Sequence, residues 1–74
     1  MTRPVKRSFS IKGHRTSISL EAAFWTALKD AAREEALPLA NLIASIDSAR
    51  GTAGLSSAVR VWILERYQRA SQKP

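Results

Sequence analysis

The residues with the most evident chemistry are the basic side chains of the first twenty positions. This segment contains five basic residues and no acidic one, so it holds +5 of the chain's formal net charge of +6. Guanidinium and ammonium groups gathered on one segment attract a polyanion. The sequence therefore predicts that a polyanionic partner contacts residues 1–20. The five residues are Arg3, Lys6, Arg7, Lys12 and Arg15.

Polar and apolar side chains alternate over residues 15–20. Successive side chains of a β-strand point to opposite faces, so this alternation predicts a strand with two different faces. The apolar face consists of Thr16, Ile18 and Leu20. The polar face consists of Arg15, Ser17 and Ser19. This second face would present a guanidinium and two hydroxyls, which are hydrogen-bonding groups suited to a polar partner.

Residues 5–11 are also rich in β-formers, but their apolar positions have the opposite parity to those of residues 15–20. The register must therefore change between the two segments, and Gly13 is the residue that permits a turn or a bend there. Two arrangements follow. Residues 1–13 form either a basic arm that bends at Gly13 or the first strand of an intrachain hairpin. Residues 14–20 form a strand in both.

Two helices are expected next along the chain. Apolar residues recur at three- and four-residue spacing over residues 21–36, which is typical of an amphipathic helix. Pro38 ends that helix, because a proline disfavours helical backbone at the residue before it. Pro38 also suits the first position of a second helix, which we expect over residues 38–50.

A third helix is expected over residues 55–70, with Ser56 or Ser57 as its N-cap. Its apolar residues extend around more than one side of the helix, which predicts contacts with more than one neighbour. The strand and the three helices fit a single domain, residues 1–74.

Several classes of protein are excluded by what the sequence lacks. The chain has no cysteine and one histidine, His14, so we expect neither disulfides nor a metal site. No nucleophile–base set, glycine-rich phosphate loop or Walker-type string is present, so we expect neither an enzyme nor a cofactor. No apolar run could span a bilayer, and no signal-peptide core follows the first basic residues. We therefore expect a cytoplasmic protein without membrane contact.

Three strings of residues resemble the ribbon-helix-helix family, the fold class of the Arc and methionine repressors. They are His14-Arg15-Thr16-Ser17-Ile18-Ser19-Leu20-Glu21, Phe24-Trp25-Thr26-Ala27-Leu28 and Leu37-Pro38-Leu39-Ala40-Asn41-Leu42-Ile43. The chain is most similar to a compact bacterial branch with an added C-terminal helix. The resemblance implies a mainly α fold with a short β-ribbon, formed as an intermolecular antiparallel pair of strands in an intertwined homodimer. It also implies sequence-specific binding to double-stranded DNA and regulation of transcription, usually as a repressor.

In that family the ribbon lies in the major groove and its exposed side chains read bases. The resemblance therefore assigns base contacts to Arg15, Ser17 and Ser19. It assigns phosphate contacts to basic side chains and to backbone N–H groups at the start of the second helix. These residues are Arg3, Lys6, Arg7, Lys12, Leu39 and Ala40. The family commonly has Ser or Thr where this chain has Pro38, so we expect the contact from the helix start to be weaker here.

A chain this short usually completes its core by oligomerising. The dimer core is expected to consist of Ile18, Leu20, Phe24, Trp25, Leu28, Leu42, Ile43, Ile46 and Trp62. The string Leu55-Ser56-Ser57-Ala58-Val59 also resembles the start of the family's second helix. Residues 55–70, rather than residues 38–50, could therefore fill that role. A second function stays open as well. The domain could be a protein-interaction module, such as an antitoxin, that holds a partner protein through residues 55–70.

Overall fold

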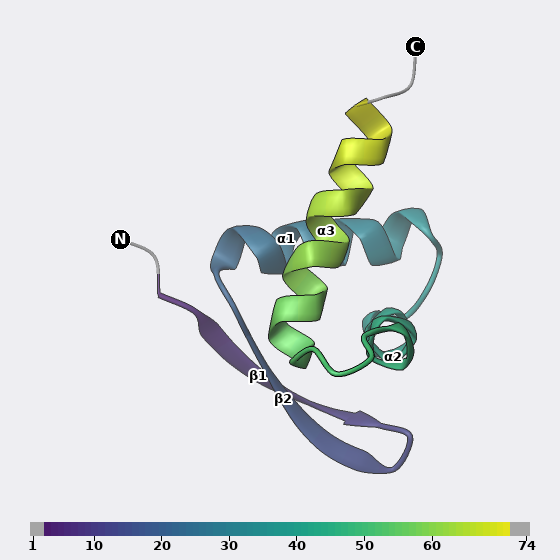
Figure 1. Cartoon of the computed structure of the whole chain (residues 1–74). Coiled ribbons are helices and arrows are strands. Elements are labelled where there is room, and N and C mark those ends of the chain that lie inside the picture. The colour runs from purple at the N-terminus through teal and green to yellow at the C-terminus, as the bar shows by residue number, and fades with distance from the viewer. Residues whose placement is uncertain (1–2, 72–74) are drawn as a thin grey trace.

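A computed structural model describes residues 3–71 of the chain (Figure 1). Its elements follow in the order β1 (Val5–Ile11), β2 (His14–Leu20), α1 (Ala22–Glu34), α2 (Leu39–Ala49) and α3 (Leu55–Ser71). The strands form a hairpin, and the three helices pack against it. The fold is therefore mainly α-helical with a short β-ribbon, as the sequence predicts. No helix in this part of the chain is both long and apolar enough to cross a membrane.

The hairpin decides between the two arrangements expected for the basic segment. β1 and β2 pair antiparallel in seven Cα pairs that run the full length of both strands. Lys12 and Gly13 connect them, with φ of 51° and 79°. Positive φ at both central residues is what a type I′ turn requires. A two-residue connection also brings the apolar positions of the two strands to one face, which accounts for their opposite parity. The hairpin is confirmed, and the bent arm is wrong.

α1 ends in a Schellman motif that turns the chain toward α2. The Leu37 N–H donates to the Ala32 carbonyl at 2.9 Å, and the Ala36 N–H donates to the Arg33 carbonyl at 3.1 Å. Ala36 itself has a φ of 56°, in the left-handed region where glycine is the usual residue. The backbone is therefore strained at Ala36, and this conformation allows a short connection between the two helices.

The starts of α2 and α3 differ from the sequence-based expectation. Pro38 is extended, with φ of −58° and ψ of 145°, so it is the N-cap of α2 and not its first helical residue. In α3 the Ala58 N–H donates to the Gly54 carbonyl at 2.9 Å. Gly54 is therefore the N-cap, and Ser56 and Ser57 lie inside the first turn. Glycine is an acceptable N-cap although it has no side chain. Because Ser56 is not the N-cap, its hydroxyl is available for another contact.

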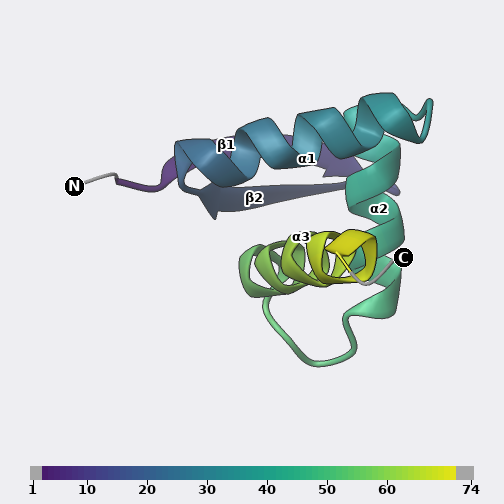
Figure 2. The ribbon, with the colours of Figure 1, turned by 90° about the horizontal axis from the view of Figure 1, so that it is seen from above.

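All three helices lie on one side of the ribbon, with α2 crossing the ends of α1 and α3 near the hairpin turn (Figures 1 and 2). The core fills the space between the ribbon and the helices. Its most deeply buried side chains come from β2 and from every helix: Ile18, Leu20, Leu28, Ile43 and Val59. Both α2 and α3 pack on α1, and which of them takes the role of the family's second helix stays a prediction.

A single chain buries most of the residues that were expected in a dimer core. Seven of those nine residues have at most 4% of their surface exposed. The other two, Phe24 and Trp62, are half-buried at the edge of the same core. One chain therefore builds a core without a second copy. Contacts of these residues across a dimer stay a prediction.

Candidate nucleic-acid interface

The face of the ribbon turned away from the helices carries only polar side chains. The strand register aligns Lys6 with Ser19, Ser8 with Ser17, and Ser10 with Arg15. Five of these residues are exposed, and Ser19 is half-buried. We call this set the outward face: Lys6, Ser8, Ser10, Arg15, Ser17 and Ser19. It presents two cations and four hydroxyls, and no carboxylate lies on it.

The opposite face of the ribbon is anchored in the core. Ile18 and Leu20 have no exposed surface, and Ile11 is 6% exposed. The Phe9 ring lies beside that of Trp25, with 6.0 Å between centroids. Because alternate residues are held in the core, a slip of one position would bury the polar set instead. The core thus fixes the register in which the outward face is presented.

Arg7, a predicted phosphate contact, lies on the inward face of β1. Its guanidinium carbon is 5.3 Å from the centroid of the Trp25 ring, which is a cation–π distance. The Trp25 indole N–H also donates to the Val5 carbonyl at 2.9 Å. Trp25 therefore ties β1 to α1, and the structure separates Arg7 from the outward face.

Two side chains of α3 reach the free edge of β2. The Ser19 N–H donates to the Ser56 hydroxyl at 3.0 Å, and Arg60 donates to the Ser19 carbonyl at 3.1 Å. Arg60 also donates to the Glu21 carboxylate at 3.0 Å and lies 5.8 Å from the Phe24 ring centroid. The hydrogen bond from Arg60 holds the pKa of the Glu21 carboxyl below its usual value. This half-buried cluster fixes the C-terminal end of β2 against α3.

Positive charge continues from the outward face to the hairpin turn. The Lys12 ammonium donates to the Ser48 hydroxyl of α2 at 2.8 Å. A hollow of about 410 Å³ beside the turn is lined by residues of the hairpin, including Arg15, and by Asp47 and Arg50 at the end of α2. Arg50 is paired with Asp47. Lys12 and Arg15, in contrast, make no salt bridge within residues 3–71. The positive charge of these two hairpin residues is therefore not balanced by a carboxylate in this part of the chain.

The remaining predicted phosphate contacts lie at separate places. Arg3 is exposed and precedes β1. At the start of α2, the N–H groups of Asn41 and Leu42 both donate to the Pro38 carbonyl. The N–H groups of the two preceding residues, Leu39 and Ala40, are the ones that a helix start leaves free. The predicted base contacts thus lie on one face together with Lys6, and the other predicted phosphate contacts lie away from that face.

Comparison with known proteins decides the family. A model of the ribbon-helix-helix domain matches residues 4–67. The chain belongs to the ribbon-helix-helix family. Domains of this family commonly bind DNA as transcription regulators, generally form dimers and are typically not enzymes. Searches of curated proteins and of solved structures found no match.

In this ribbon-helix-helix domain the outward face is larger than the polar face that the sequence predicts. The family resemblance implies a phosphate contact for Lys6 and gives no role to Ser8 or Ser10. The signal was nevertheless present, because a two-residue turn at positions 12–13 requires Ser10 to lie opposite Arg15. Once that pair is fixed, period-two alternation places Ser8 and Lys6 on the same face.

The contacts of Ser56 and Arg60 with β2 had no signal in the sequence. Ser56 and Arg60 follow Ser19 in the sequence by 37 and 41 positions. No local pattern indicates a contact between residues so far apart. In a ribbon-helix-helix domain with an added helix, they show where that helix lies. It covers one end of the free edge of the ribbon.

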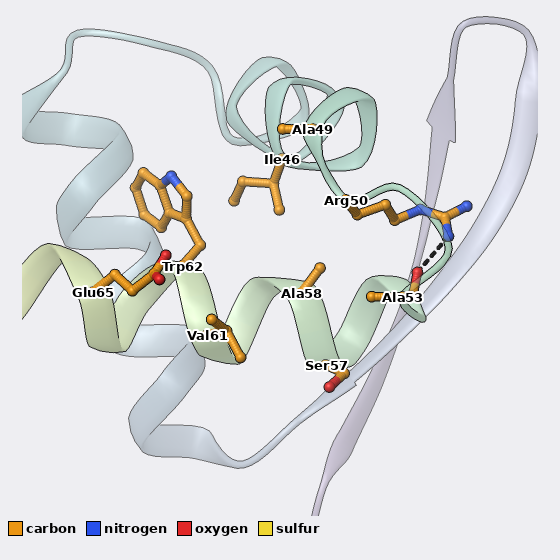
Figure 3. Close-up of a pocket in the computed structure, with 9 residues that line it drawn as sticks. All are labelled: Ile46, Ala49, Arg50, Ala53, Ser57, Ala58, Val61, Trp62 and Glu65. Carbon is orange, nitrogen blue, oxygen red and sulfur yellow. Dashed lines mark hydrogen bonds between the residues drawn. The ribbon is translucent and has the colours of Figure 1, made fainter.

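A further hollow of the ribbon-helix-helix domain, of about 260 Å³, lies between α2, the loop that follows it, and α3 (Figure 3). Its walls include the apolar side chains of Ile46, Val61 and Trp62, and at its rim Arg50 donates to the Ala53 carbonyl. Among residues 3–71, no three His, Asp or Glu side chains are grouped closely enough to hold a metal ion.

Proposed function

We propose that the domain binds double-stranded DNA by placing the outward face of the ribbon in the major groove, and that it thereby regulates transcription. The observation that supports this most is the outward face itself, a two-stranded ribbon with six polar side chains and no carboxylate. The major groove is about 12 Å wide and admits a two-stranded ribbon, and each base pair presents a distinct pattern of donors and acceptors there.

Arg15 is the residue that we assign to a guanine. A guanidinium can donate two hydrogen bonds to the O6 and N7 atoms of that base, and Arg15 is exposed and makes no salt bridge within the described residues. Ser17 and Ser19 both donate and accept hydrogen bonds, so they discriminate less between bases. Arg15 therefore carries most of the sequence preference that we assign to β2.

Phosphate contacts are assigned to groups around the outward face. Arg3 and Lys12 lie beyond the two ends of β1, where they can contact the sugar-phosphate backbone on either side of the groove. The free N–H groups of Leu39 and Ala40 can bind one phosphate oxygen at the positive end of α2. Pro38 adds neither a hydroxyl nor an N–H, so this contact is weaker than one made by a Ser or Thr cap.

A binding titration tests the proposal. A duplex selected from a random pool should bind at low salt, and the logarithm of the affinity should fall with the logarithm of salt by about 0.9 for each phosphate neutralised. Arg15→Ala should reduce the preference for the selected duplex. Arg69→Ala, which removes the same charge near the end of α3, should preserve it. Absence of binding to any duplex at low salt would contradict the proposal.

A second candidate function is a protein-interaction module, and exposed apolar residues on α3 favour it. Val61, Leu64 and Tyr67 are 50%, 55% and 56% exposed, and together with residues of α1 they line one apolar hollow. A stoichiometric protein partner, captured by the wild type and lost with Leu64→Lys, would support this function. This substitution leaves the core side of α3 intact, unlike removal of residues 55–70.

A further inference from the structure

We propose that the apolar hollow between α1 and α3 is a surface on which a second copy of this chain docks. The hollow has a volume of about 440 Å³, and apolar side chains of both helices form most of its lining. We thereby name the partner for the second candidate function, on which the proposal rests. The contact lies in the helical layer and uses none of the residues assigned to DNA.

The hollow exists because small residues form its wall on the α1 side. Ala23 and Ala27 are about one helical turn apart, so both face the same side of α1, and neither fills the space toward α3. On the α3 wall, Val61, Leu64 and Tyr67 are each at least 50% exposed. An apolar concavity therefore lies directly beside apolar side chains that are open to solvent. Exposed apolar patches of this kind mark interaction surfaces.

A second copy fits this surface because the surface carries both halves of a contact. In a two-fold symmetric dimer the same patch of each chain meets the other, so the patch must be complementary to itself. Leu64 of one chain can enter the hollow of the other beside Ala27, while its own hollow receives the partner's Leu64. One docking event thus buries two exposed leucines and fills two hollows.

The charges around the hollow also favour a second copy. Arg60 is the one charged residue among those of the described chain that line it, and it pairs with the Glu21 carboxylate at 3.0 Å. Further along α3, Arg66 pairs with the carboxylates of Glu34 and Glu35. Two copies can therefore meet here without bringing unpaired cations together. The unpaired cations of two ribbons would instead repel each other.

The hollow is also continuous with the free edge of β2. Arg60 lines the hollow and donates to the Ser19 carbonyl at 3.1 Å. A second copy at the hollow therefore lies next to the edge at which the family resemblance implies that two ribbons pair. Since ribbon-helix-helix domains generally form dimers, a second copy is the occupant that this position favours.

Docking at the hollow leaves the fold of each chain and its outward face unchanged. A single chain already buries Ile18, Leu28 and Val59 completely, so each chain is folded before the second copy docks. Self-association therefore depends on protein concentration, and the stability of the dilute chain does not include it. The outward face lies on the side of the ribbon away from the helices, so both copies keep it uncovered.

Self-association of the full chain without DNA tests the proposal. Sedimentation velocity over a wide range of protein concentration should show the wild type passing from one chain to two. Leu64→Lys should weaken this association at least about 10-fold, because each contact would bury a charge in place of an apolar side chain. Leu37→Lys makes the same change outside the hollow, at a residue that is 41% exposed. It should associate like the wild type, and circular dichroism checks that both variants fold.

A cross-link locates the contact even if Leu64→Lys fails to fold. The chain has no cysteine, so Leu64→Cys supplies a single thiol with a smaller change of side chain. A short bis-maleimide should join two copies of this variant. At the same concentration it should leave Leu37→Cys as single chains. Equal cross-linking of the two variants would overturn the proposal.

Two results of the sedimentation experiment would also overturn it. One is a wild type that stays a single chain at every concentration. The other is a dimer that Leu64→Lys leaves equally stable, since the copies would then meet at another surface. If the wild type stayed a single chain but bound a different protein through Leu64, the second candidate function would stand without the proposed partner. Because DNA is absent from these experiments, their outcome is separate from that of DNA binding.

Discussion

The ribbon and the helical layer use their charged side chains in opposite ways. Four arginines of the helical layer lie within salt-bridge distance of a carboxylate: Arg33, Arg50, Arg60 and Arg66. Within residues 3–71, no basic residue that precedes α1 makes such a pair. All six acidic residues follow position 20. The helices therefore balance their charge within the chain, and the charge of the ribbon is left for a partner.

The two regions also differ in stability, because the ribbon depends on the helical layer more than the helical layer depends on the ribbon. Two strands alone are marginal in water, and the outward face adds no apolar burial. The helices contribute most of the core, and the ribbon is held to it by its inward side chains. The binding region is therefore stable only through its attachment to the near-neutral region behind it.

The largest expected effect comes from breaking that attachment at Trp25. This residue is 3% exposed and bonds the Val5 carbonyl. Trp25→Ala should lower the free energy of unfolding by about 3–5 kcal/mol, because it removes a buried aromatic ring and leaves a cavity. Urea unfolding followed by circular dichroism measures it. Tyr67→Ala, at a residue that is 56% exposed, should change stability by about 0.5 kcal/mol at most. Equal effects of the two substitutions would contradict the role given to Trp25.

The next effect concerns binding and leaves the fold unchanged. Arg15→Ala should cost about 1–3 kcal/mol of binding free energy on the selected duplex and less on unrelated sequences. Anisotropy titrations on both duplexes measure the difference. An equal loss on every sequence would show that Arg15 contacts phosphate and reads no base.

A smaller effect, of opposite sign, is expected at the end of α1. Ala36 has a positive φ of 56°, which glycine adopts without steric cost. Ala36→Gly should therefore stabilise the domain by about 0.5–1 kcal/mol. Thermal unfolding measures this change, and DNA binding should stay as in the wild type. A destabilised variant would show that the left-handed conformation at this residue is not the one populated.

The smallest effect is a pH dependence at the edge of the ribbon. Arg60 lowers the pKa of the Glu21 carboxyl in the folded state. The unfolded state then binds more protons, so this contribution to stability is present above the unfolded pKa and is lost as the pH falls through the folded pKa. The pair is partly exposed, so the contribution is small. When the free energy of unfolding is measured from about pH 3 to pH 7, it should fall less steeply toward acid pH for Glu21→Gln than for the wild type. Identical pH profiles for the wild type and Glu21→Gln would show that the Arg60–Glu21 pair does not contribute to stability.

Local patterns predicted much of this fold. Alternation over residues 15–20 predicted the strand and its faces, because the period of a strand is visible in a few residues. Helical spacing predicted α1, α2 and α3, with ends that agree to within two residues. Gly13 was recognised as the break in register. It suits a type I′ turn and a bend equally well, so the sequence did not decide between the hairpin and the arm.

What the sequence did not predict depends on contacts between distant residues. The side of β2 that α3 covers is fixed by Ser56 and Arg60, which have no local relation to Ser19. The sequence predicts the burial of residues such as Leu28 and Ile43, but in a core shared by two chains, whereas a single chain already buries them. A hairpin supplies a second strand from the same chain, and that strand helps to cover the core.

The most direct test of the division between a binding ribbon and a balanced helical layer is an NMR titration of the labelled protein with a selected duplex at low salt. Amide shifts should change over Val5–Leu20 and at Leu39 and Ala40, and they should stay constant for Val61, Leu64 and Tyr67. Changes centred on these three residues of α3, with none on the ribbon, would contradict the account.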